Sequence, residues 1–139
     1  MSLAYFTDRD LGTRFPAILK AAGLRVELHQ DHFRPDARDE DWLRAVGEEG
    51  WIALTHDRRI RYKPNELAAV VRFRVSLLVI VGRAPYPDLA RSFVATIPRV
   101  ERFVSDHQPP FIGKVFRPSP AELRANAAAL GRVELWYPR

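Results

Sequence analysis

The chain has 139 residues, of which 47% are hydrophobic, so it has the length of one domain and can bury a substantial core. It contains no cysteine, which excludes disulfides, thiol catalysis and Cys-ligated zinc. The net charge of +5 and the pI of about 10.1 favour an anionic partner, nucleic acid before a membrane surface. A basic protein without such a partner is the alternative.

The first 57 residues alternate strand-like and helix-like segments. Apolar runs predict strands over residues 3–7, 25–29 and 51–54, and helical spacing predicts helices over 12–22 and 39–50, with a loop at 30–38. Strand, helix, strand, helix, strand with short connections is typical of a parallel sheet with crossover helices. In such a sheet the carboxyl ends of the strands lie on one side, where ligands bind.

The second half continues the alternation. We expect a helix from 64 to about 74, a strand at 76–81, a long helix at 88–107 and a strand at 112–116. Pro98 should kink or split the long helix. The composition changes after Pro118, where 120–130 favours a helix and 134–137 an edge strand or a docking segment. We therefore predict a domain over residues 1–117 and a tail over 118–139 that docks on the domain or on a partner.

Targeting and membrane segments are not expected. Charged side chains interrupt residues 1–20, so this stretch lacks the apolar region of a signal peptide. No uncharged run approaches the 18 or so residues that a membrane-spanning helix needs. We expect a cytoplasmic protein.

Acidic residues fall at three places that such a sheet would bring to one edge. Asp8 follows the first strand, Asp39 opens the second helix and Asp57 follows the third strand. Carboxylate oxygens are the ligands that Mg²⁺ or Mn²⁺ prefers, and these ions also bind phosphate oxygens. Each acid taken alone is more often a turn residue or part of a helix start than a metal ligand. Their joint position predicts a metal site with Asp8, Asp39 and Asp57 as metal-binding and catalytic residues.

Basic residues come directly after the third acid. Arg58, Arg61 and Lys63 are candidates for binding RNA phosphate, although such a segment can also be a solvated surface. His56, beside Asp57, is a candidate general base or a residue that adjusts the site. The chain has no G-x-S-x-G motif and no P-loop.

Four stretches resemble the PIN-like family, in particular the small VapC-like toxin components of toxin–antitoxin pairs. They are FTDRDLG at 6–12, DEDWL at 39–43, GWIALTHDRRI at 50–60 and PFI at 110–112. The resemblance implies a three-layer α/β PIN-like domain, with a mostly parallel central sheet flanked by helices, over residues 1–117. It also implies a metal-dependent endoribonuclease that uses Mg²⁺ or Mn²⁺, with RNA as substrate.

Within that resemblance, Asp8 matches the first acid and Asp57 the acid of the Thr-x-Asp motif. Asp39 is the choice for the helix acid, and Glu40 and Asp41 remain open as additional acids. Many PIN nucleases carry a fourth acid after the next strand, but residues 81–84 read VGRA. Asp10, two residues after Asp8, could supply the missing oxygen.

The toxin class implies a cognate antitoxin, and the basic charge of this chain predicts that this antitoxin is acidic. A homodimer is an open alternative to a monomer. A catalytically silent nucleic-acid-binding domain on the same fold is the second functional hypothesis. A flavodoxin-like or receiver-like Mg²⁺ protein is the third, although Asp8, Asp10 and Lys114 match the receiver pattern poorly.

Overall fold

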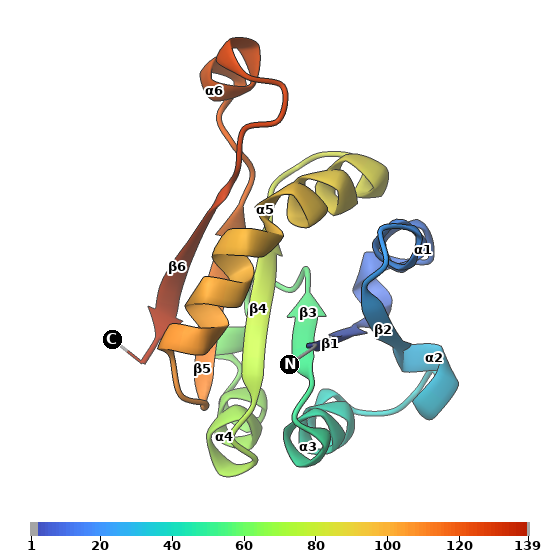
Figure 1. Cartoon of the computed structure of the whole chain (residues 1–139). Helices are drawn as coiled ribbons and strands as arrows, with labels where there is room; N and C mark the ends of the chain where they lie inside the picture. The colour runs from blue at the N-terminus through green and yellow to red at the C-terminus, as the bar shows by residue number, and fades with distance from the viewer. Residues whose placement is uncertain (1–2, 139) are drawn as a thin grey trace.

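The computed structural model describes residues 3–138 and confirms the predicted α/β architecture, a six-stranded and mostly parallel sheet flanked by helices (Figure 1). The strand order is β2-β1-β3-β4-β5-β6, in which only β6 runs antiparallel to its neighbour. The strands are β1 (Ala4–Thr7), β2 (Arg25–Leu28), β3 (Ile52–Thr55), β4 (Ser76–Val81), β5 (Phe111–Phe116) and β6 (Arg132–Tyr137). The α-helices are α1 (Arg14–Ala21), α2 (His29–His32), α3 (Asp39–Glu49), α4 (Pro64–Arg72), α5 (Tyr86–Asp106) and α6 (Pro120–Ala125), with short 3₁₀ helices η1 (Arg9–Leu11) and η2 (Ile60–Tyr62).

Most of these boundaries follow from local chemistry. Pro64 begins α4 at a position where its missing N–H is not needed, and Ser119 caps α6 by accepting a hydrogen bond from the backbone N–H of Glu122. Gly50 ends α3 with a φ of 72°, a left-handed conformation that glycine adopts at little cost.

Three predictions about helices were wrong. The segment 30–38, expected to be a loop, contains most of the short helix α2. Helix α5 is not split at Pro98 but continues through it, with the buried side chains Phe93 and Val100 on either side, so only the kink that Pro98 predicts stays open. The tail helix ends at Ala125 rather than near 130.

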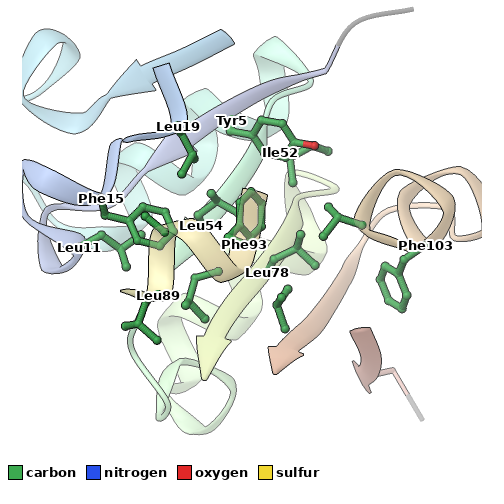
Figure 2. Packing of buried hydrophobic residues seen from close by; sticks show 14 of the residues in the cluster. Tyr5, Leu11, Phe15, Leu19, Ile52, Leu54, Leu78, Leu89, Phe93 and Phe103 are labelled. Atoms are coloured by element: carbon green, nitrogen blue, oxygen red, sulfur yellow. The ribbon is translucent and has the colours of Figure 1, made fainter. Parts of the chain in front are cut away.

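The core has two parts, one on each face of the sheet, because successive strand residues point to opposite faces. On the face covered by α1 and α5, Tyr5 and Leu54 pack against Phe15 and Phe93, as Figure 2 shows. On the other face, Phe6 stacks on Trp42 of α3 with ring centroids 5.5 Å apart. Both layers hold β1 and β3 rigidly, and the candidate site lies at the carboxyl ends of these two strands.

Strand β1 lies at the point where the chain changes direction across the sheet. The chain passes from β1 to β2 on one side and then returns through α3 to β3 on the other side of β1. The register pairs Thr7 with Leu54, and the backbone N–H of Asp8 donates to the Leu54 carbonyl at 3.0 Å. In doubly wound sheets such a switch point opens a crevice at the carboxyl edge, where ligands bind.

Part of the C-terminal tail completes the sheet. Strand β6 pairs with β5 over a register that includes Lys114 opposite Glu134. Figure 1 shows α6 at the end of an extended connection, away from the other helices. Within residues 3–138, no helix has both the length and the apolar character that crossing a membrane requires.

Candidate active site

A cavity of about 620 Å³ lies over the carboxyl ends of β1 and β3, and we call it the acidic cavity. Its wall contains both acids that the sequence placed at strand ends, Asp8 and Asp57, as well as Asp39 at the start of α3. It also contains Asp10, which the sequence had suggested only as an additional acid. Its other lining residues are Arg9, His29, Ala37, His56, Lys63 and Tyr86.

Asp8 and Asp10 form a close pair around the Thr55 hydroxyl. The oxygen of that hydroxyl lies 2.9 Å from Asp8 Oδ2 and 3.0 Å from Asp10 Oδ2. Asp10 reaches this position because the 3₁₀ turn η1 follows Asp8 directly. The backbone N–H of His56 also donates to Asp10, and the Tyr86 hydroxyl donates to the Asp10 carbonyl at 2.6 Å. The pair is therefore fixed by contacts with β3 and α5.

The Asp8–Asp10 pair carries more negative charge than its surroundings neutralise. Burial, followed by the neighbouring Asp10 carboxylate, raises the pKa of Asp8 to about 7, although the Thr55 hydrogen bond opposes the shift. Burial also raises the pKa of Asp10. A hydroxyl has one hydrogen, so Thr55 cannot donate to both carboxylates at once. When both acids are ionised, the pair needs a cation or a further hydrogen-bond donor besides Thr55.

Asp39 and Asp57 form a different arrangement, in which a lysine supplies the positive charge. The Lys63 ammonium donates to Asp57 Oδ2 at 2.6 Å and lies 4.0 Å from Asp39 Oδ2. The hydrogen bond to Asp57 raises the pKa of Lys63. Asp39 also accepts a hydrogen bond from the indole N–H of Trp42 at 3.0 Å.

The two arrangements decide how well the cavity fits a divalent cation. Across residues 3–138, no three His, Asp or Glu side chains gather closely enough to hold a metal. The three aspartates that the sequence predicted as one metal site, Asp8, Asp39 and Asp57, therefore do not converge on one point. Mg²⁺, however, keeps several waters and commonly takes only one or two carboxylates plus substrate phosphates. The Asp8–Asp10 pair offers two half-buried carboxylates with unneutralised charge. The chemistry of this donor pair fits such an ion.

The remaining sequence candidates lie in different places. Glu40 and Asp41 do not line the acidic cavity, and the Asp41 carboxylate instead accepts a hydrogen bond from the backbone N–H of Arg38. Asp88, the acid nearest to the position of the missing fourth acid, pairs with Arg91 on α5. The Arg61 guanidinium lies over the rings of Tyr62 and Trp136, and Arg58 is exposed beside the cavity.

Histidine 56 is fixed as a support for the site. Its ring nitrogen Nδ1 lies 2.8 Å from the Ile80 carbonyl, and since a carbonyl only accepts, Nδ1 carries the hydrogen. Its ring also packs edge-on against Tyr86, at a centroid distance of 5.9 Å. These contacts connect the ends of β3 and β4 to the start of α5.

Sequence reasoning missed three contributions to the site. Thr55 was part of a quoted motif but was given no role, and Lys63 was assigned to phosphate rather than to acids. Tyr86 was not considered. The spacing Thr-x-Asp was a usable signal for Thr55, because a hydroxyl ending a buried strand must find a partner at the strand end. Nothing local identifies the partner of Lys63 or Tyr86.

These features define a class, an α/β domain with paired carboxylates at the switch point of a parallel sheet. The model of the PIN-like domain family matches residues 3–82, which is more than half of the chain, and the chain belongs to that family. Neither the curated proteins nor the solved structures give a match.

Proposed function

We propose that this PIN-like domain is a metal-dependent endoribonuclease that hydrolyses phosphodiester bonds at the acidic cavity. The observation that supports it most is the pair of half-buried carboxylates, Asp8 and Asp10, held at the carboxyl edge of the sheet by Thr55. In the PIN-like family this fold is often a nuclease. The basic charge of +5 fits a nucleic-acid substrate.

The proposal gives each side chain a task. Asp8 and Asp10 would hold Mg²⁺ or Mn²⁺, which when bound supplies a polarised water and charge stabilisation at the phosphate. Thr55 and the His56 backbone N–H keep the two carboxylates in one orientation, so the pair needs no rearrangement. Arg9 lines the same cavity and carries a guanidinium suited to a phosphate oxygen.

Asp39, Asp57 and Lys63 have a supporting part in this proposal. Lys63 holds both carboxylates in the cavity wall, and Asp57 in turn orders the following turn by accepting from the Arg59 backbone N–H at 2.9 Å. Because one ammonium is shared by two carboxylates, this wall keeps a net negative charge and would repel the phosphates of the substrate. Among the sequence candidates for RNA binding, Arg58 and Arg61 stay outside the cavity lining, where they can contact the flanking phosphates.

The toxin role is part of the same proposal. A ribonuclease that acts on its own cell needs an inhibitor, and a basic surface around an acidic cavity suits an antitoxin that is acidic overall and places an arginine on the carboxylates. Such a protein would act in the cytoplasm. A homodimer is compatible with the exposed edge strand β6, which leaves backbone groups open to pairing.

A silent nucleic-acid-binding domain remains the second candidate, and one contact favours it. Lys63 forms ion pairs with two of the four aspartates in the cavity and so offsets part of the negative charge that would otherwise attract a metal ion. The two candidates differ in whether the Asp8–Asp10 pair binds a divalent ion.

The test combines a metal titration with an RNA-cleavage assay. Wild-type protein should bind Mn²⁺ by calorimetry and cleave a labelled single-stranded RNA only when Mn²⁺ or Mg²⁺ is present. The Asp10→Asn variant should lose both properties, whereas Asp36→Asn, an exposed loop acid, should keep both. RNA binding without metal binding or cleavage would establish the silent domain instead. Expression with and without a neighbouring open reading frame then tests the toxin role through growth arrest and its relief.

A further inference from the structure

A second cavity of about 410 Å³ adjoins the acidic cavity, and the proposed function leaves it without a task. This side cavity lies over the carboxyl ends of β1 and β2, between α1 and the segment that follows β2. Asp8, Arg9 and His29 line both cavities, so the two form neighbouring compartments of one trough along the sheet edge. A ligand in the side cavity would be adjacent to the carboxylate pair.

The walls of the side cavity combine apolar side chains with polar and charged ones. Ligand sites of about 300–1,000 Å³ usually have this composition. The apolar part comes from the middle of α1 and from the ends of β2 and the following loop, and the polar part comes from hydroxyl and amide side chains. The residues concerned are Pro16, Ala17, Leu28, Pro35, Thr13 and Gln30.

His29 provides an independent sign of a missing ligand. Its side chain is buried, with 4% of the residue exposed, and its Nδ1 finds no hydrogen-bond partner among residues 3–138. Its ring packs on Phe6 and Phe33, with centroid distances of 6.1 and 5.4 Å, so the orientation of the ring is fixed. Buried polar atoms are nearly always satisfied, and an exception calls for a partner that is absent from the chain.

Arg9 marks the border between the compartments. Its guanidinium donates to the Pro35 carbonyl, which holds the side chain across the trough. Burial, followed by the charge of this guanidinium, lowers the pKa of His29. A neutral imidazole has one donor and one acceptor nitrogen on opposite sides of its ring, so Nδ1 acts as either one, depending on the tautomer.

We propose that the side cavity binds the base of one unpaired nucleotide next to the scissile phosphate, with His29 as a polar residue of its wall and Arg9 on the linking phosphate. The inference rests on the proposed function for its ligand class. It adds that the substrate is single-stranded at this position, because a base enters a cavity of this kind only when it is unstacked and unpaired.

Nucleotide binding without metal tests this inference separately from cleavage. We would titrate the metal-free wild-type protein with each ribonucleoside 5′-monophosphate and follow amide chemical shifts, with ribose 5-phosphate as the control for phosphate alone. At least one nucleotide should shift amides of Thr13, Ala17 and Gln30 in a saturable way, and ribose 5-phosphate should not. Absence of such shifts for all four nucleotides would overturn the inference.

A variant that fills the cavity gives the second arm. Ala17 is exposed on α1 and lines the side cavity, so Ala17→Trp fills the space without removing a buried contact. Ala68→Trp is the matched control, since Ala68 is also an exposed helical alanine but lies on α4 outside both cavities. Ala17→Trp should weaken nucleotide binding about tenfold or more, and Ala68→Trp should not change it. Equal binding in both variants would contradict the assignment.

Replacement of the histidine gives the third arm. His29→Phe keeps an aromatic ring against Phe6 and Phe33 but removes both nitrogens, and it should weaken binding of the preferred nucleotide roughly fivefold. Asp10→Asn should bind nucleotides like the wild type while failing to cleave RNA. Saturable nucleotide shifts in a protein that never cleaves RNA would refute the proposed activity and keep the site. Cleavage of RNA without any nucleotide-dependent shift would refute the side-cavity site and keep the proposed activity.

Discussion

The acidic cavity contains two aspartate pairs that differ in how their charge is balanced. Asp39 and Asp57 share the ammonium of Lys63, which lies 4.0 and 2.6 Å from their oxygens. Asp8 and Asp10 share only the hydroxyl of Thr55, and burial raises the pKa of both. The first pair carries its own counter-ion, and the second has none.

The difference shows where an external cation has most to offer. A divalent ion at the Asp8–Asp10 pair would relieve repulsion between two half-buried carboxylates, whereas at Asp39 and Asp57 it must first displace an ammonium. Carboxylates at strand ends are therefore not equivalent merely because they line one cavity. The following predictions test this contrast, from the largest expected effect to the smallest.

The largest effect is expected from Asp10→Asn. Removing one of the two carboxylates should lower the rate of RNA cleavage by at least about 100-fold, since loss of even an outer supporting group at a metal site costs about 10–100-fold. Asp57→Asn should reduce it far less, because Lys63 already neutralises Asp57. Cleavage rates at saturating Mn²⁺ measure both effects. Equal losses in the two variants would mean that the pairs act as one site.

Lys63→Met should have the opposite effect to Asp10→Asn, because it should strengthen the binding of Mn²⁺. Without the ammonium, Asp39 and Asp57 become free to attract a cation, and the affinity for Mn²⁺ should rise about tenfold, equivalent to about 1.4 kcal/mol. Lys114→Met removes the same charge from β5, outside the cavity lining, and should leave the affinity unchanged. A calorimetric titration that shows weaker binding in Lys63→Met would indicate that the lysine supports the metal site.

The pH dependence of stability should also differ between the pairs. The pKa of Asp8 rises from 3.8 to about 7 on folding, so the native state binds a proton more tightly than the unfolded state. The stabilisation is present in full below pH 3.8 and is lost as the pH rises through about 7. Metal-free Tm should therefore fall across this window, by about 4 °C for each kcal/mol lost in a domain of this length.

Two variants serve as controls for that measurement. Asp8→Asn removes the titrating group and should flatten the fall in Tm, and saturating Mn²⁺ should do the same in the wild type. Asp57→Asn should leave the fall in place, because its pair is neutralised by Lys63. A Tm that stays level in metal-free wild type between pH 4 and 7 would contradict the crowding of Asp8 and Asp10.

The smallest effect is expected at the rim. Arg58→Ala should weaken RNA binding about equally for all sequences and reduce the slope of log K against log salt by about 1, as expected for one lost phosphate contact. Arg102→Ala, on the exposed side of α5, removes the same charge far from the cavity lining and should leave the slope unchanged. Equal slopes in both variants would place the RNA path on another surface.

Much of the fold could be predicted from the sequence. The alternation of apolar runs and helical spacing indicated the parallel sheet, and the sheet alone brings Asp8 and Asp57 to one edge. The position of Asp10 was less accessible, because it depends on the 3₁₀ turn that directs its side chain back toward Thr55. Helix α5 shows the same limit, since Pro98 left a kink and a split both possible and only the folded chain shows that the helix is continuous.

The sequence by itself determined the order of the elements, the acids at their ends and the basic charge, because periodicity and composition are local properties of the chain. Only the tertiary structure decided which acid is paired with which partner. Thr55 meets Asp10 across 45 positions of sequence, and Lys63 meets Asp39 through the packing of η2 beside α3. Side-chain contacts of this kind depend on directions in space that no local pattern encodes, and they separate the neutralised pair from the pair that is open to a cation.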